Sequence, residues 1–112
     1  MGKLNSIRMV NNIRILVNKE AKAATNAYGE FNSAHEGYAV ILEEFEEAKE
    51  NIQLMEDNLK MLWEDIKKDI SFVNDARDGG ILTTLEENAI DLIQEAIQIA
   101  AMIKKFQRLQ EL

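Results

Sequence analysis

The chain has 112 residues, a formal net charge of −7, no cysteine and no proline. This length suits a single domain, and the lack of cysteine excludes disulfides, thiolate metal sites and a cysteine nucleophile. An acidic chain repels phosphate backbones, so we expect no direct binding of nucleic acid. The sequence has neither a signal-peptide pattern nor an apolar run of about 18 residues, so we expect no membrane partner and a cytoplasmic location.

Helices are expected throughout, because proline is absent and only five glycines occur. The first is predicted over residues 4–28, where Ile7, Val10, Val17 and further apolar residues recur at three- and four-residue steps. Gly29 follows at the position of a C-terminal cap.

A second helix is predicted over residues 33–70, since Ser33 and Glu36 have the spacing of a capping box. At 1.5 Å per residue it would span on the order of 55 Å, more than a compact domain of this size needs, so we expect it to protrude or to pair with another chain. Its apolar seam has the regular spacing of a coiled coil and comprises Tyr38, Ile41, Phe45, Ala48, Ile52, Met55, Leu59, Leu62 and Ile66.

A linker is expected over residues 74–80, where two glycines adjoin a charge cluster. The third helix is predicted over residues 84–110, with a capping box at Thr84 and Glu87. Two apolar rows on this helix together cover roughly 200° of its circumference, so it needs neighbours on two sides. The sequence therefore predicts one all-α domain, residues 1–112, whose long antiparallel helices form an oligomeric bundle as a homodimer or homotetramer.

Acidic side chains are the main candidates for chemistry. Glu44 and Glu47 are three residues apart, which puts both carboxylates on one helical face, where they can share a hard divalent cation. A polar strip on the third helix could face them across an antiparallel pair; it comprises Asn88, Asp91, Glu95 and Gln98. In both cases the spacing alone favours an ordinary solvated helix face over a metal site.

The remaining polar and aromatic candidates have simpler interpretations. His35, the only histidine, stands in the first turn of the second helix, where a capping or surface role is favoured. Lys104, Lys105 and Arg108 could meet a phosphate, but cations near a helix C-terminus also suit the helix dipole, and we favour that role. Trp63 lies just off the apolar seam and is open to packing or to stacking on a nucleobase.

Two phrases, residues 35–47 and 95–102, resemble in sequence and order the small phage and prophage members of the MazG-like all-α nucleotide pyrophosphohydrolase superfamily. They cover 13 and 8 residues of the chain. Members of that superfamily cleave nucleoside triphosphates between the α and β phosphates, with Mg²⁺ held by an E-E-x-x-E motif on one helix and an E-x-x-D motif on another. The resemblance implies a MazG-like bundle, a nucleotide substrate, and Mg²⁺ or Mn²⁺ as cofactor.

Carried over residue by residue, the first motif falls on Glu43, Glu44 and Glu47, and Glu95 matches the first position of the second motif. The resemblance thus makes Glu44 and Glu47 the catalytic pair. The metal ligands it implies, together with the substitutes discussed next, are Glu43, Glu44, Glu47, Asp91, Glu95 and Gln98.

The chain departs from the pattern at Gln98, where the superfamily has aspartate. An amide oxygen is a neutral ligand and binds a doubly charged ion less strongly than a carboxylate, and Asp91, one turn earlier, is a possible replacement. The alternative function is therefore a noncatalytic helical interaction or structural protein, of phage or prophage origin, that has lost the full metal site.

Overall fold

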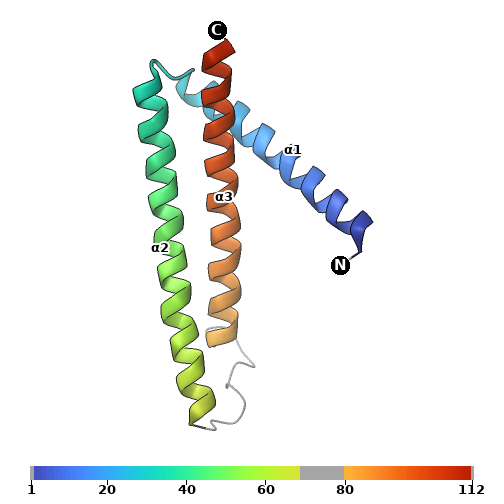
Figure 1. The fold of residues 1–112 in the computed structure, drawn as a ribbon, viewed down its shortest axis with the longest axis vertical. Coiled ribbons are helices and arrows are strands. Elements are labelled where there is room, and N and C mark those ends of the chain that lie inside the picture. The colour runs from blue at the N-terminus through green and yellow to red at the C-terminus, as the bar shows by residue number, and fades with distance from the viewer. Residues whose placement is uncertain (1, 69–79, 112) are drawn as a thin grey trace. The chain divides into compact units, whose positions relative to one another are not determined.

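The computed structural model describes residues 2–68 and 80–111, which form three helices: α1 (Lys3–Tyr28), α2 (Ala34–Lys67) and α3 (Ile81–Glu111) (Figure 1). These residues include no strand, which confirms the predicted all-helical class. Most of the predicted linker, residues 74–79, lies outside the described residues. A search of the described helices finds none with a stretch long and apolar enough to cross a bilayer.

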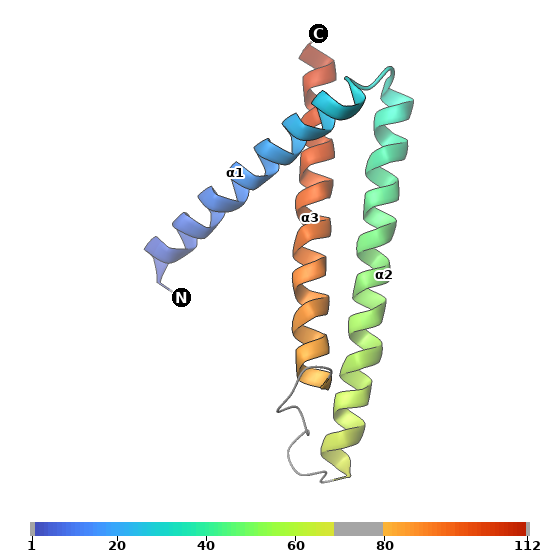
Figure 2. The same cartoon turned by 180° about the vertical axis from the view of Figure 1, so that it is seen from behind.

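The chain divides into two compact units, residues 1–45 with 95–112, and residues 46–94. Within each unit a segment of α2 lies beside a segment of α3, and the two segments run antiparallel (Figures 1 and 2). α1 belongs to the first unit, where it lies against the C-terminal part of α3. The single domain predicted from the sequence stays a prediction.

The connection between α1 and α2 follows the local sequence. The N–H of Gly29 donates to the carbonyl oxygen of Thr25 at 2.7 Å, and its φ of 77° lies in the region that favours glycine, which confirms the predicted cap. The N–H of Glu36 donates to Ser33 Oγ at 3.1 Å, as a capping box requires. The Glu36 carboxylate accepts from the side-chain amide of Asn32 at 3.0 Å, not from the Ser33 N–H that the capping box predicts.

The capping box predicted at the start of the third helix is wrong. α3 begins at Ile81, three residues before the predicted position, so Thr84 lies inside the helix. Its hydroxyl donates to the carbonyl oxygen of Gly80 at 3.0 Å, and its N–H donates to the same oxygen at 2.9 Å. A threonine inside a helix commonly bonds back to the preceding turn in this way.

The core of the first unit is small. Four apolar residues are buried there, Val17 from α1, Phe31 from the connection, and Ala101 and Met102 from α3. The partly buried apolar residues that pack against them are Ala21, Ala24, Val40, Ile41, Ile97, Ala100, Phe106 and Leu109. These contacts hold the last three turns of α1 and the first turns of α2 to the C-terminal half of α3.

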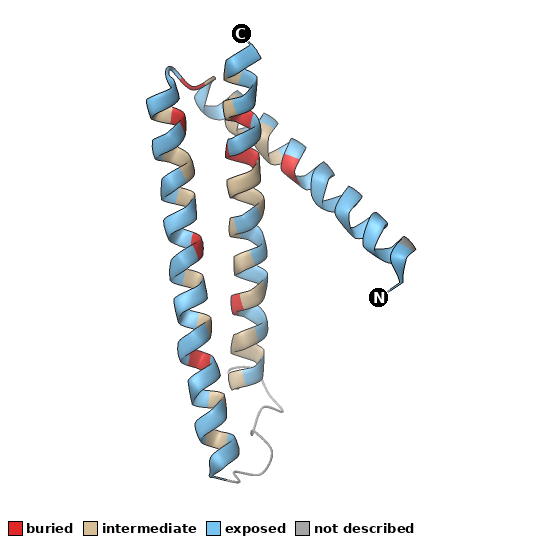
Figure 3. Cartoon of the chain, in the orientation of Figure 1, coloured by how far each residue is buried: buried red, intermediate tan, exposed pale blue. Residues whose placement is uncertain are grey.

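The side of α2 that packs within the chain differs from the predicted seam (Figure 3). Its buried and half-buried residues include Glu36 and Val40 in the first turns and a row at steps of three and four, which comprises Gly37, Ile41, Glu44, Ala48, Asn51, Met55, Asn58, Leu62 and Asp65. Four positions of the predicted seam, Ile41, Ala48, Met55 and Leu62, lie on this packing side and confirm the prediction. The other five predicted positions are exposed and do not pack within this chain. These five positions form an exposed row, 45% to 65% accessible, of Tyr38, Phe45, Ile52, Leu59 and Ile66.

Polar residues pair inside the second unit. Asn58 on α2 and Asn88 on α3 are both buried, and Asn58 Nδ2 donates to Asn88 Oδ1 at 2.6 Å. A buried amide must find a partner to offset the loss of water, so this pair favours one register of α2 against α3 in that unit.

Candidate metal centre

Glu44 and Glu95 lie on facing helices of the first unit. Each occupies a position of the packing side of its helix: Glu44 lies between Ile41 and Ala48 on α2, and Glu95 lies three residues after Leu92 on α3. Both side chains are half-buried, and Glu95 Oε2 is shielded from solvent. The heptad-like spacing of the two helices thus carries two carboxylates into the antiparallel contact.

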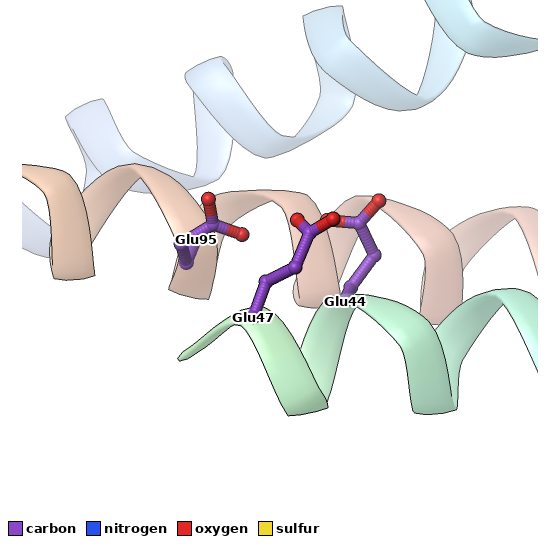
Figure 4. Close-up of side chains that lie close together, drawn as sticks. All are labelled: Glu44, Glu47 and Glu95. Carbon is purple, nitrogen blue, oxygen red and sulfur yellow. The ribbon is translucent and has the colours of Figure 1, made fainter. Parts of the chain in front are cut away.

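Glu47 completes a group of three. It lies on α2 one turn beyond Glu44, so the uninterrupted helix fixes its backbone relative to Glu44, and its side chain is exposed. One carboxylate oxygen from each of Glu44, Glu47 and Glu95 lies within 4.8 Å of the others (Figure 4). The structure therefore brings together three of the six ligands expected from the sequence.

The donor set fits a hard divalent cation. Mg²⁺ takes oxygen ligands at about 2.0–2.1 Å, so two oxygens on opposite sides of the ion are roughly 4.2 Å apart. Oxygens at adjacent positions of the octahedron are about 3 Å apart, so carboxylate oxygens within 4.8 Å of one another must approach by up to about 2 Å, a change that rotation about the glutamate side-chain bonds can supply without moving the helices. Three carboxylates also supply the negative charge that offsets the dehydration of such an ion.

The other three expected ligands are placed differently. Glu43 and Asp91 are exposed and contribute no atom to the described carboxylate group. Gln98 is half-buried and lines the same groove as Glu44. Whether its amide binds an ion stays a prediction.

A groove of about 530 Å³ opens beside Glu44 in the first unit. We call it the carboxylate groove. Its charged members are Glu20, Glu36, Glu44 and Lys105, and its apolar wall includes Tyr28, Phe31, Val40 and Met102. Such a mixture of aromatic surface with a few charged groups suits a small molecule that has an apolar part and a charged part.

Lys105 is the one cation that lines the carboxylate groove. The residue is only 5% exposed, and its Nζ lies 4.3 Å from the centre of the Phe31 ring, within the range of a cation–π contact. The sequence predicts a helix-dipole role for Lys105 and gives no sign of its contact with Phe31. Its position four residues after Ala101 on the packing side of α3 was the signal that it would be buried.

No family model matches the chain, and neither the curated proteins nor the solved structures include a match.

Proposed function

We propose that the chain is a Mg²⁺-dependent nucleoside triphosphate pyrophosphohydrolase, with Mn²⁺ as a second competent cofactor. The observation that carries this proposal is the meeting of Glu44 and Glu47 with Glu95, which come from the two separate phrases. The two phrases thus contribute carboxylate oxygens to one cluster, and carboxylate oxygens are the ligands that a hard divalent cation prefers.

The reaction proposed is the one that the resemblance implies. A water oxygen bonds to the α-phosphorus of the substrate, the bond from that phosphorus to the bridging oxygen breaks, and pyrophosphate leaves together with a nucleoside monophosphate. A divalent cation supplies charge neutralisation on the phosphate oxygens and lowers the pKa of bound water. Glu44 and Glu95, both half-buried, would hold the ion, while the exposed Glu47 would contact solvent and orient the attacking water.

We further propose that two or four copies associate. The exposed row on α2 places five large apolar side chains at seven-residue intervals, which is the repeat by which one helix packs along another. Contiguous exposed apolar surface of this kind marks an interaction site. Association of copies would form the MazG-like oligomeric bundle that the resemblance implies.

The second candidate is a noncatalytic helical interaction protein. The exposed row supports this candidate as well as the first, and Gln98 in place of aspartate favours it. The two candidate functions differ in what they require of the carboxylates. The enzyme requires a divalent cation bound by Glu44 and Glu95, whereas an interaction protein does not.

The test is pyrophosphate release from a panel of ribo- and deoxyribonucleoside triphosphates with Mg²⁺ or Mn²⁺. The native chain is compared with Glu44→Gln, Glu47→Gln and Glu95→Gln, and Glu46→Gln serves as the matched control, because Glu46 is exposed and pairs with Lys49 at 3.6 Å. We expect release by the native chain and the control, and at least a hundredfold loss in the other three. Absence of release from the folded native chain would favour the interaction protein.

A further inference from the structure

A second groove, of about 450 Å³, lies between α1 and α3 in the first unit. We call it the basic groove, because Lys22, Lys104, Lys105 and Arg108 line it and Glu111 is its one acidic residue. All but one of the remaining lining residues carry an amide or a hydroxyl group. These groups donate hydrogen bonds, and with the cations they favour an anion with several acceptor oxygens.

The charge of this groove is opposite to that of the chain. The protein has a net charge of −7 and only 13 lysines and arginines, of which four are here. Arg108 is engaged through Nε, which donates to Glu30 Oε1 at 2.7 Å, but its side chain is 63% exposed. The guanidinium is thereby oriented by Glu30 and keeps further N–H groups for a ligand.

Lys105 connects the two grooves, since it lines both. Its aliphatic stem is buried in the core, and its ammonium group lies over Phe31. Among the described residues no carboxylate forms an ion pair with it. A largely desolvated cation that forms no ion pair attracts an anion more strongly than a surface lysine does.

We infer that the basic groove binds polyphosphate, with Lys105 as the cation that contacts the phosphates. On the proposed function, the polyphosphate bound there is the leaving pyrophosphate part of a nucleotide. That the polyphosphate belongs to a nucleotide rests on the proposed function. The affinity of the basic groove for polyphosphate rests only on the charge and geometry of that groove.

The experiment is calorimetric titration of the full chain with inorganic pyrophosphate in a buffer without divalent cations. The native chain is compared with Lys105→Met, which keeps the aliphatic stem and removes the charge. The matched control is Lys19→Gln, because Lys19 is exposed on the same helix α1 as Lys22 but does not line the groove. We expect about tenfold weaker binding in Lys105→Met, little change in the control, and a steep loss of affinity with added salt.

A second variant protects the test against misfolding. Lys22→Gln combined with Lys104→Gln changes two exposed side chains and should also weaken binding about tenfold. Lys105→Arg keeps the charge and should retain most of the affinity. Failure of the native chain to bind pyrophosphate, or equal affinity in the double variant and in the Lys19→Gln control, would overturn the inference.

The outcomes separate this inference from the proposed function. Glu44→Gln should leave cation-free pyrophosphate binding intact, since Glu44 does not line the basic groove. Pyrophosphate binding without hydrolysis of any nucleoside triphosphate would keep the inference and refute the enzyme. Hydrolysis by the native chain, together with a pyrophosphate affinity that is equal in the double variant and in the Lys19→Gln control, would keep the enzyme and refute the inference.

Discussion

Replacing Gly37 by alanine tests how tightly the N-terminal end of α2 packs in the first unit. Gly37 is buried inside a helix. A methyl group at this position would collide with Phe106 Cδ2, and it would lie 2.7 Å from Phe106 Cε2 and 3.2 Å from Phe31 Cδ2. Carbon atoms in ordinary contact are about 3.5–4.0 Å apart, so the Phe106 ring has to move by roughly 1 Å.

Two opposing effects set the magnitude. Alanine is favoured over glycine inside a helix by about 1 kcal/mol. Forcing an extra methyl group into packed surroundings costs about 1–3 kcal/mol, and the upper part of that range applies because two aromatic rings must adjust. We expect Gly37→Ala to lower the free energy of unfolding by about 1–2 kcal/mol.

Urea unfolding followed by circular dichroism at one fixed protein concentration measures this loss as a lower midpoint with an unchanged slope. A double-mutant cycle with Phe106→Leu adds a second criterion. The smaller leucine side chain makes room for the new methyl group, so the double variant should lose less stability than the sum of the two single losses. If Gly37→Ala raised stability by about 1 kcal/mol, as helix propensity alone dictates, the packing argument would be refuted.

Two further predictions concern the helix pair and association. Asn58→Ala leaves the buried amide of Asn88 without its partner and should lower the free energy of unfolding in urea by about 1–3 kcal/mol, whereas replacing both asparagines by leucine should change it little. Equal losses of stability in the two variants would contradict the role of the 2.6 Å hydrogen bond. Phe45→Glu places a charge in the exposed row and should reduce the molar mass measured by light scattering, while Leu54→Glu, at an equally exposed position of α2 outside that row, should not; an unchanged mass in both would exclude the row from the interface.

The sequence predicted features that depend on local backbone chemistry. Gly29 ends α1 because a left-handed backbone is needed there, and the Ser33 hydroxyl caps the start of α2. Thr84 was misread because a threonine hydroxyl that can cap a helix can equally bond back to a carbonyl inside one. Pattern alone does not distinguish the two roles.

The packing side of α2 was predicted at every second position. Ile41, Ala48, Met55 and Leu62 belong to both the predicted and the observed sides. The alternate observed positions are glycine, glutamate, asparagine and aspartate residues, and a search for hydrophobic periodicity rejects such residues in favour of the apolar row beside them. A polar residue is accepted in a helix contact only when it finds a partner, and partners such as Asn88 are known only once the register is known.

The candidate metal centre likewise depends on polar residues at packing positions of the helices. Glu44 and Glu95 could be named from the resemblance, but their meeting depends on both helices turning polar positions toward each other. The role of Lys105 was missed because helix-end chemistry gave a sufficient local reason for a cation, while its burial over Phe31 depends on a residue 74 positions earlier in the chain.

The most direct test of the central claim is a Mn²⁺ titration followed by electron paramagnetic resonance, in which bound Mn²⁺ is read from the loss of the free-ion signal. We expect saturable binding to the native chain and to Glu46→Gln, and binding at least tenfold weaker in Glu44→Gln and Glu95→Gln. Equal Mn²⁺ affinity in all four proteins would show that the three carboxylates do not form a metal centre.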